Sequence, residues 1–228
     1  MLAFAEPFTE QLIPEFKHVR ACVSEAIADL ADIYHPDVNL CIVERSIAKE
    51  LETFVKDLLA SGTELSLVEH LTLKSFDFYG LLPQLAHLPG HQAFCADIAT
   101  LSALYADLFG LQGIGLRLRT LDKPMCPKFH VDAVTCRLVC TYGGIGTEWL
   151  ADSDVNRAKL GVGSGGLSDA ESGLLLREDA IQTMPANAIG LIKGCAWEGN
   201  ELHGAVHRSP QVTSASPRRL LLTLDFGG

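Results

Sequence analysis

Apolar residues follow two different periods along the chain, and the change falls near residue 112. Before it they recur at spacings of three and four, which is typical of one buried face of an α-helix. The pattern predicts helices over 19–33, 47–58 and 94–108. Pro36 ends the first helix, and a short strand over 38–43 follows it. The first stripe is Val19, Val23, Ala26, Leu30 and Ile33.

After residue 113 the period becomes two, since Leu116 and Leu118 alternate with Arg117 and Arg119. Such alternation predicts a half-buried strand. Further strands are predicted over 129–141, 173–177, 188–193, 203–207 and 218–226. Short strands without intervening helices favour an antiparallel barrel or jelly roll. We therefore expect an α+β protein: an antiparallel double-stranded β-helix over 113–228, with a helical layer over 1–112 packed on it as one compact unit.

The last predicted strand has two unlike faces. Leu220, Leu222, Leu224 and Phe226 share one face with Arg218, whereas Leu221, Thr223 and Asp225 share the other with Arg219. The second face is typical of a cavity wall. An arginine rooted there can bind a carboxylate through two parallel hydrogen bonds, which a lysine cannot reproduce. Arg219 is thus preferred over Arg218 as an anion-binding residue.

The bulk composition restricts the class of protein. The 228 residues are 48% hydrophobic and 20% charged, which is typical of a globular chain. The formal net charge of −10 argues against nucleic acid or an anionic membrane as a partner. The N-terminus lacks the basic start and long apolar stretch of a signal peptide. Seven cysteines without CxxC spacing predict free thiols in a cytoplasmic protein.

The segment "CPKFHVDAVTCRLV" carries the first candidate site. His130 and Asp132 are two residues apart, so in a strand they face the same side. An imidazole and a carboxylate placed in this way can supply two ligands of the facial triad of non-haem iron(II) enzymes. A surface or core histidine without a metal is the commoner meaning of this dipeptide spacing alone. The third ligand must come from elsewhere.

"ELHGAVHRSP" offers two candidates for that third ligand, His203 and His207, which share a face if the segment is a strand. Cys126, four residues before His130, could instead serve a zinc site. Cys136 and Cys140 would face the same side as His130 if the strand had no bulge. A buried cysteine more often acts as a small apolar residue.

HxD, the distal histidine in "AVHRSP" and the arginine in "RRLLLTLDF", together with the preceding "GLIKG", resemble the iron(II)/2-oxoglutarate dioxygenase superfamily over residues 113–228. The resemblance implies iron(II) bound by His130, Asp132 and His207, the last preferred over His203 because "HRSP" occupies the family's position. It also implies that Arg219, helped by Thr223, anchors 2-oxoglutarate. One departure is the lack of a serine two residues after Arg219.

"CPKFHVD" and "RLVCTYGGIGTEWL" resemble a bacterial family described only as domain of unknown function 1826. That resemblance implies no activity. The superfamily resemblance implies an oxygenase of hydroxylase type that decarboxylates 2-oxoglutarate while it oxidises a C–H bond of a substrate that the sequence does not identify. The alternative is a non-catalytic, cupin-like protein that handles or senses Zn(II). Both hypotheses leave the oligomeric state open.

Three other features receive structural interpretations. "GVGSGG" at 161–166 matches the dinucleotide fingerprint but follows no apolar strand, so we expect a loop over 161–169. The glycines of "TYGGIGTEWL" permit a close backbone approach, and Glu148 and Trp149 could line a barrel mouth, although we favour a hairpin with a packed Trp149. Alternation points Arg137 away from His130, toward a carboxylate under the helices.

Overall fold

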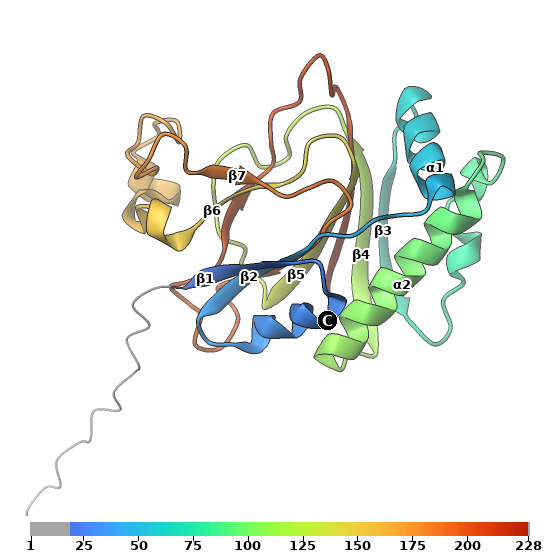
Figure 1. The fold of residues 1–228 in the computed structure, drawn as a ribbon, viewed down its shortest axis with the longest axis horizontal. Helices are drawn as coiled ribbons and strands as arrows, with labels where there is room; N and C mark the ends of the chain where they lie inside the picture. Colours follow the sequence, from blue (N-terminus) through green and yellow to red (C-terminus); the bar gives the residue numbers. More distant parts are fainter. Residues whose placement is uncertain (1–18, 228) are drawn as a thin grey trace, which may run out of the picture.

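The computed structural model describes residues 19–227, so the segment 1–18, where we expect no signal peptide, lies outside the described residues. The described chain forms a larger and a smaller β-sheet, with helices against the larger one (Figure 1). In the larger sheet all neighbouring strands are antiparallel except β1 and β2, which are parallel. Its order is β1 (Arg20–Ser24), β2 (Val38–Val43), β8 (Ile189–Lys193), β5 (Cys136–Gly143), β10 (Arg219–Phe226), β4 (Gly113–Leu121) and β3 (Ser66–Thr72). The smaller sheet has the order β7 (Ile181–Thr183), β6 (Glu148–Leu150) and β9 (Val206–Arg208), with antiparallel pairs.

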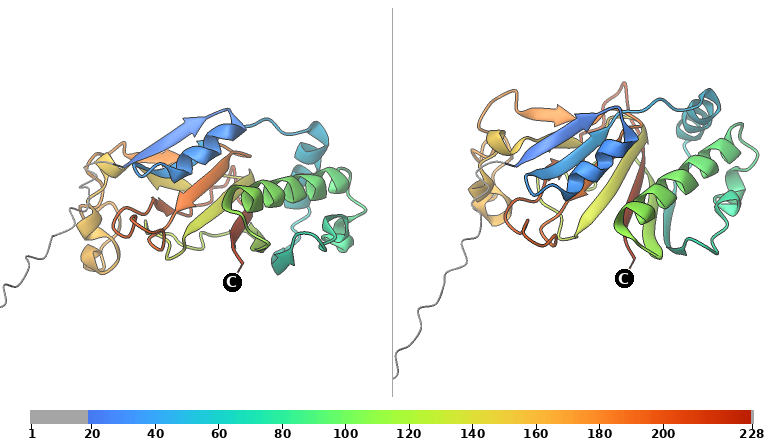
Figure 2. Two further views of the ribbon diagram at one scale, coloured as in Figure 1. Left: turned by 90° about the horizontal axis from the view of Figure 1, so that it is seen from below. Right: turned by 60° about the horizontal axis from the view of Figure 1, so that its bottom comes forward.

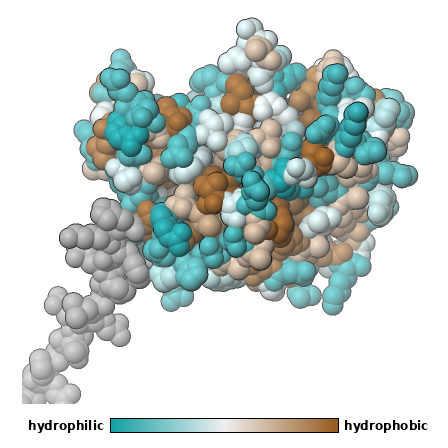
Figure 3. Space-filling model, viewed as in Figure 1, coloured by the Kyte–Doolittle hydropathy of each residue, from teal (hydrophilic) through white to brown (hydrophobic). Residues whose placement is uncertain are grey.

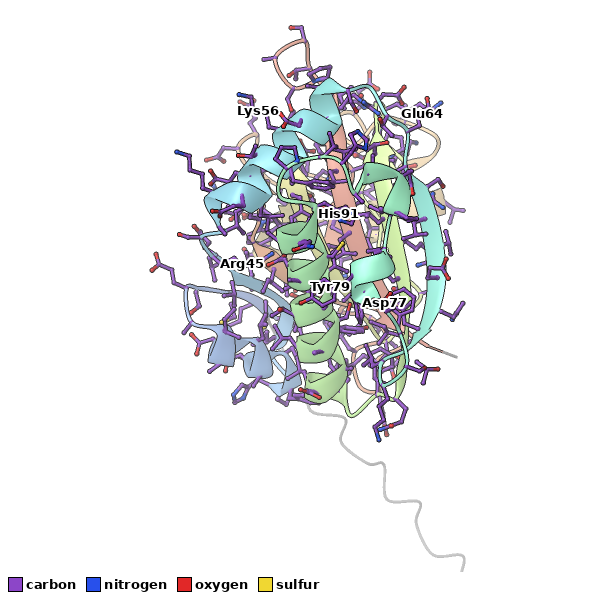
Figure 4. All side chains as sticks on the ribbon, turned by 90° about the vertical axis from the view of Figure 1, so that its right-hand side faces the viewer. Arg45, Lys56, Glu64, Asp77, Tyr79 and His91 are labelled. Carbon is purple, nitrogen blue, oxygen red and sulfur yellow. The ribbon has the colours of Figure 1, made fainter. Side chains whose placement is uncertain are left out.

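Helices α1 (Lys49–Ala60) and α2 (His91–Phe109) cover one face of the larger sheet (Figures 2 and 4). Phe54 of α1 stacks on Phe94 of α2 with ring centroids 4.7 Å apart, and both are fully buried. Tyr105 binds α2 to the sheet, since its hydroxyl donates to the carbonyl of Cys136 at 2.6 Å. The 3₁₀ helices are η1 (Ile27–Tyr34), η2 (Phe78–Gly80), η3 (Pro83–Leu85), η4 (Asp152–Asp154), η5 (Arg157–Lys159) and η6 (Gly161–Ser164).

The opposite face of the larger sheet packs against the smaller sheet. A second apolar cluster lies between the two sheets and includes Ile42, Val139, Trp149, Met184 and Ile192, all buried. Because side chains alternate along a strand, each strand of the larger sheet sends one set of residues to the helices and the other set between the sheets. The site described below uses this second set.

Several predicted elements are confirmed. Helices α1 and α2 bury the predicted stripes, β2 has the predicted bounds, and β4, β8 and β10 lie within the predicted strands. The two faces of β10 also separate as expected. Leu220, Leu222 and Leu224 lie in the core under the helices, whereas Asp225 and Arg219 face the other side.

The helix predicted over 19–33 is wrong in its first half. Residues 20–24 form β1, which pairs in parallel with β2, and η1 covers only Ile27–Tyr34. The reason is that a spacing of four places residues on one face of a strand as well as on one face of a helix. Val19 and Val23 therefore could not distinguish the two, and pairing with β2 decided the outcome.

The strand predicted over 129–141 begins only at Cys136, because residues 132–135 form an irregular segment. No strand covers 173–177; Leu175 makes only an isolated bridge with Val155. The predicted strand over 203–207 is β9 at Val206–Arg208. Strands β3, β6 and β7 were not predicted, and the last two are three residues long, too short to show a period. The loop expected over 161–169 contains the 3₁₀ turn η6.

All seven cysteines are free thiols, as predicted. Cys136 and Cys140 do not face the side of His130, because they are buried in the core under the helices. Burial raises the pKa of Cys140 to about 11 and that of Cys136 further, so both thiols stay protonated.

The first 112 residues contribute three strands as well as the helices, and β2 lies inside the larger sheet. Over the described residues, none of the helices has the length and apolar character that crossing a membrane requires. The face seen in Figure 3 carries polar residues over most of its outline, with smaller apolar areas between them.

Replacement of Phe54 by Ala tests the core between helices and sheet. The side chain is fully buried and stacked on Phe94, so its truncation should lower the free energy of unfolding by about 3–5 kcal/mol. Urea unfolding followed by circular dichroism measures this change. Val68→Ala is the control, because Val68 is 51% exposed on edge strand β3, and its truncation should cost under about 1 kcal/mol. Equal effects of the two substitutions would contradict the packing described.

Candidate metal centre

His130, Asp132 and His207 converge in the structure. One ligand atom from each lies within 4.8 Å of the others, and no other such group of His, Cys, Asp or Glu occurs in residues 19–227. Nε2 of His130 is 3.6 Å from Oδ1 of Asp132, and Nε2 of His207 is 3.4 Å from Oδ2. The two imidazole rings have centroids 4.6 Å apart. The structure thus brings the predicted triad together, although His130 and His207 are 77 positions apart in the sequence.

Hydrogen bonds to the backbone fix the tautomer of both histidines. Nδ1 of His130 lies 3.0 Å from the carbonyl oxygen of Lys128, and Nδ1 of His207 lies 3.1 Å from that of Ala205. A carbonyl oxygen can only accept, so both Nδ1 atoms carry the proton. Both Nε2 atoms, the remaining ring nitrogens, then face the carboxylate of Asp132. Three Lewis bases facing one another in this way fit a divalent cation placed between them.

The backbones around the two histidines are joined directly. His130 and His207 exchange two N–H···O bonds of 3.0 Å each, which form an isolated antiparallel bridge. Asp169 adds a second connection, since its Oδ2 accepts from the amide of Phe129 at 3.1 Å and from Nη1 of Arg208 at 2.7 Å. Phe129 and Arg208 are the sequence neighbours of the two histidines. This arrangement holds both imidazoles at a fixed separation before any ligand binds.

A glycine places the segment that carries Asp132. The amide of Cys195 donates to the carbonyl of Asp132 at 2.9 Å, just after Gly194 of "GLIKG". A Cβ added at Gly194 would lie 2.0 Å from the carbonyl oxygen of Val134 and 2.6 Å from that of Asp132. Only glycine permits this approach. The irregular turn at 132–135 is therefore packed against β8 rather than continued as a strand.

The carboxylate of Asp132 belongs to a chain of alternating charges. Arg137 of β5 donates to Oδ2 of Asp132 at 2.7 Å and also binds Asp225 of β10 through Nε at 2.7 Å. Asp225 in turn pairs with Arg117 of β4. The prediction that Arg137 points away from the site, under the helices, is wrong. The turn at 132–135 breaks the alternation that would have carried His130 and Arg137 to opposite faces.

These contacts set the charge of the triad. Burial by itself would raise the pKa of Asp132, but the hydrogen bonds with His130 and His207 and the charge of Arg137 outweigh it and hold the pKa well below its usual range. The carboxylate is therefore ionised at neutral pH. The pKa of His130 is raised by its hydrogen bond with Asp132, which burial partly opposes.

Arg219 is 1% exposed, between the two sheets, on the face of β10 that also carries Asp225. Its Nε donates to the carbonyl of Ile145 at 2.5 Å, and Nη2 lies 3.3 Å from the hydroxyl of Thr141 and 3.4 Å from that of Thr147. Nη1 is buried and has no hydrogen-bond partner among the described residues. Burial lowers the pKa of Arg219 to about 10, an effect that the charge of Glu148 partly opposes, so the guanidinium remains charged at neutral pH. No carboxylate of the described residues forms an ion pair with it.

Gly144 leaves the space that Arg219 occupies at this position. Gly144 has a φ of +87°, and a Cβ there would lie 2.4 Å from the carbonyl oxygen of Arg218 and 2.8 Å from Cγ of Arg219. This is the close backbone approach predicted for "TYGGIGTEWL". Arg218 points elsewhere, since its guanidinium donates to the carbonyls of Leu59 and Thr63.

The other residues that the sequence suggested for the site lie outside the triad. Thr223 lies on the face of Arg219 but four residues further along β10, opposite Arg117 and Val139, and makes no hydrogen bond with Arg219. Neither His203 nor Cys126 belongs to the converging group. Trp149 is buried opposite His207 in the β6–β9 pair, as expected for a packed residue, while Glu148 forms an ion pair with Arg208 at 2.6 Å. Sequence reasoning pointed Arg137 the wrong way and gave no specific role to Asp225, Thr141, Thr147 or Asp169, because their roles depend on contacts between segments distant in the sequence.

Comparison with known proteins identifies the family and the fold. The family model described as "Protein of unknown function (DUF1826)" matches residues 24–225, so the chain belongs to that family. No match was found among curated proteins. Among solved structures, the rice dioxygenase for auxin oxidation aligns with a TM-score of 0.50 at 13% identity, over 92% of this chain and 83% of the dioxygenase.

A candidate oxygenase from Shewanella oneidensis also aligns with a TM-score of 0.50, at 12% identity, over 92% of this chain and 89% of the other. At such identities the likeness concerns the fold alone. The chain thus has the mixed α+β fold of these proteins, with two sheets, and a triad that resembles an iron(II) site.

The triad is tested by metal binding to single variants. His130→Ala removes one of three ligands and should weaken binding of Co(II), a spectroscopic probe, by about 100-fold or more. His203→Ala is the matched control, because His203 lies four residues from His207 in the sequence but outside the triad. The Co(II) affinity of this variant should stay within about twofold of the wild type. Visible absorption in the presence of a competing chelator measures both. Equal losses in the two variants, or none in His130→Ala, would contradict the assignment.

Proposed function

We propose that this DUF1826 protein is an iron(II)- and 2-oxoglutarate-dependent oxygenase of hydroxylase type. One combined observation carries the proposal: a triad of two imidazoles and a carboxylate lies on the same side of the larger sheet as a buried arginine with an unpartnered N–H. A metal site alone would not call for such an arginine. The fold shared with the rice dioxygenase supports the proposal but does not carry it.

His130, Asp132 and His207 would hold iron(II) through Nε2, a carboxylate oxygen and Nε2. Three protein ligands would leave room on the ion for the cosubstrate and for oxygen. Bound iron and 2-oxoglutarate would supply the oxidising chemistry, in which O2 places one oxygen atom in succinate and the other in the substrate, with release of CO2. Arg137 binds Oδ2 of Asp132, which would leave Oδ1 the freer oxygen to hold the ion.

Arg219 would bind the distant carboxylate of 2-oxoglutarate. Its Nη1 has no partner among the described residues, and a buried donor left unpaired costs about 1–3 kcal/mol. A carboxylate would supply the missing acceptor and the missing counter-charge together. Thr141 and Thr147 hold the guanidinium plane in position, and Thr223, which lies between Arg219 and Asp225 on the same strand face, would line the path toward the metal.

The finer description of the fold is part of this proposal. The two sheets would correspond to the double-stranded β-helix of the superfamily, formed mainly by residues 113–228, and α1 and α2 from residues 1–112 would form the layer outside it. Support comes from the apolar cluster enclosed between the sheets and from the position of the triad where β9 meets the segment before β5.

The role of Arg219 is tested by anaerobic titration with iron(II) followed by 2-oxoglutarate. Wild type should develop the weak visible charge-transfer band of the iron chelate. Arg219→Met should weaken 2-oxoglutarate binding by about 100-fold, which corresponds to about 2.7 kcal/mol, while iron affinity stays within about threefold. Arg218→Met is the matched control, since that guanidinium binds only the carbonyls of Leu59 and Thr63, and it should retain the band.

Two results would count against the proposal. Retention of 2-oxoglutarate affinity in Arg219→Met would move the anchor to another residue. Tight zinc binding by the wild type, with no chelate formed by iron and 2-oxoglutarate, would favour the alternative of a non-catalytic protein that handles or senses zinc, because two histidines and a carboxylate also bind Zn(II).

A further inference from the structure

A second arginine on the same sheet face also lacks a partner. Of the five buried side-chain polar atoms without a hydrogen bond in residues 19–227, two belong to guanidinium groups, Nη1 of Arg219 and Nε of Arg119. Nη1 of Arg119 lies 3.8 Å from the sulfur of Met125, which is a weak acceptor. No carboxylate of the described residues lies within 4.0 Å of Arg119. The proposed cosubstrate accounts for Arg219 but not for Arg119.

Strand register places Arg119 beside Arg219. In the antiparallel β4–β10 pair, Leu221 lies opposite Arg119 and Arg219 lies opposite Leu121. Arg119 and Arg219 are therefore diagonal neighbours on one face, with Cα atoms about 7–8 Å apart. Arg117, two residues before Arg119 on that face, is paired with Asp225 and so joins the charges around Asp132. Arg119 is the residue of this face that is left for another ligand.

Arg119 borders a cavity of about 620 Å³, a size typical of small-molecule sites. Leu65, Leu121, Pro124 and Met125 supply apolar wall, and the lining residues 122–125 lie five to eight positions before His130 in the sequence. Figure 4 labels Glu64 at the end of the sheet where α1 leads into β3, which marks the rim of the cavity.

The charged groups around the cavity restrict the ligand. Lys123 and Arg218 also line it, but Lys123 is exposed and Arg218 is occupied by backbone carbonyls. Glu64 and Asp122 are exposed acidic residues on the same lining. Two carboxylates at the rim oppose a polyphosphate or nucleic-acid strand by like-charge repulsion. A single carboxylate attached to an apolar group can pair with Arg119 and place the rest of the molecule against the apolar wall.

We propose that Arg119 binds the carboxylate of the primary substrate, so that the substrate is an organic monocarboxylic acid with an apolar body. This inference rests on the proposed function, because it gives the oxygenase its substrate class. Arg219 would then hold the cosubstrate, and Arg119 would hold the carboxylate of the substrate in the cavity that it borders.

The test is calorimetric titration of the full chain, loaded anaerobically with iron(II) and saturating 2-oxoglutarate so that Arg219 is occupied. The probes are hexanoate, octanoate, benzoate and phenylacetate, each compared with its primary amide. At least one acid should bind at least tenfold more tightly than its amide. Arg119→Met should lower the affinity for that acid at least tenfold and leave the affinity for the amide unchanged. Lys123→Met removes an exposed charge from the same cavity, and its affinity for the acid should stay within twofold of the wild type. Arg119→Lys should give an intermediate loss. Thermal unfolding of each variant checks that the fold is retained.

Three outcomes would overturn the inference: no acid of the panel binds better than its amide, Arg119→Met binds the acids as the wild type does, or Arg119→Met loses 2-oxoglutarate affinity as Arg219→Met does. The last would place Arg119 in the cosubstrate anchor. The proposed function fails separately, by the absence of an iron and 2-oxoglutarate chelate in the wild type. In that case repetition of the titration with the unloaded chain still decides whether Arg119 binds carboxylates.

Discussion

The buried carboxylate of Asp132 is the constraint on which the rest of the site depends. An isolated ion in a protein interior costs several kcal/mol, so Asp132 requires cationic partners. Arg137 provides one, but a buried guanidinium needs its own counter-charge, which Asp225 supplies, and Asp225 is balanced by Arg117, whose side chain is 41% exposed. The charges thus alternate from the interior to the solvent. Only the imidazole side of Asp132 is left for a ligand, and there both histidines present their Nε2 atoms.

This charge arrangement is possible because the strands keep their two faces chemically separate. Leucines at alternate positions of β10 fill the core under α1 and α2, and the residues between them, Arg219 and Asp225 among them, are free to be polar. The apolar face supplies the stability that holds the polar face in a fixed geometry. Buried arginines would otherwise recruit water or move to the surface. The helices therefore contribute to the site although they supply none of its ligands.

The sequence was sufficient for those features that depend on local periodicity or on a motif with a fixed order. The helices α1 and α2, strand β2, the two faces of β10 and the convergence of His130, Asp132 and His207 are of this kind. It was insufficient where two periods coincide, as at Val19 and Val23, and where an irregular turn resets the alternation. The turn at 132–135 depends on Gly194, about 60 residues later, so the orientation of Arg137 could not follow from its own neighbours. The partners of Arg219 likewise come from strands whose pairing no local pattern specifies.

Several divalent cations bind to two imidazoles and a carboxylate, so the triad by itself does not distinguish catalysis from metal storage. The distinction lies in the groups beyond the ligands. A storage site gains nothing from unpaired buried donors, which lower stability, whereas a site that binds two anions in a defined order requires donors that stay unsatisfied until those anions arrive. Arg219 and Arg119 carry such donors on the same face as the triad. Their cost to the folded chain is the physical reason for which we propose chemistry on bound acids rather than metal binding alone.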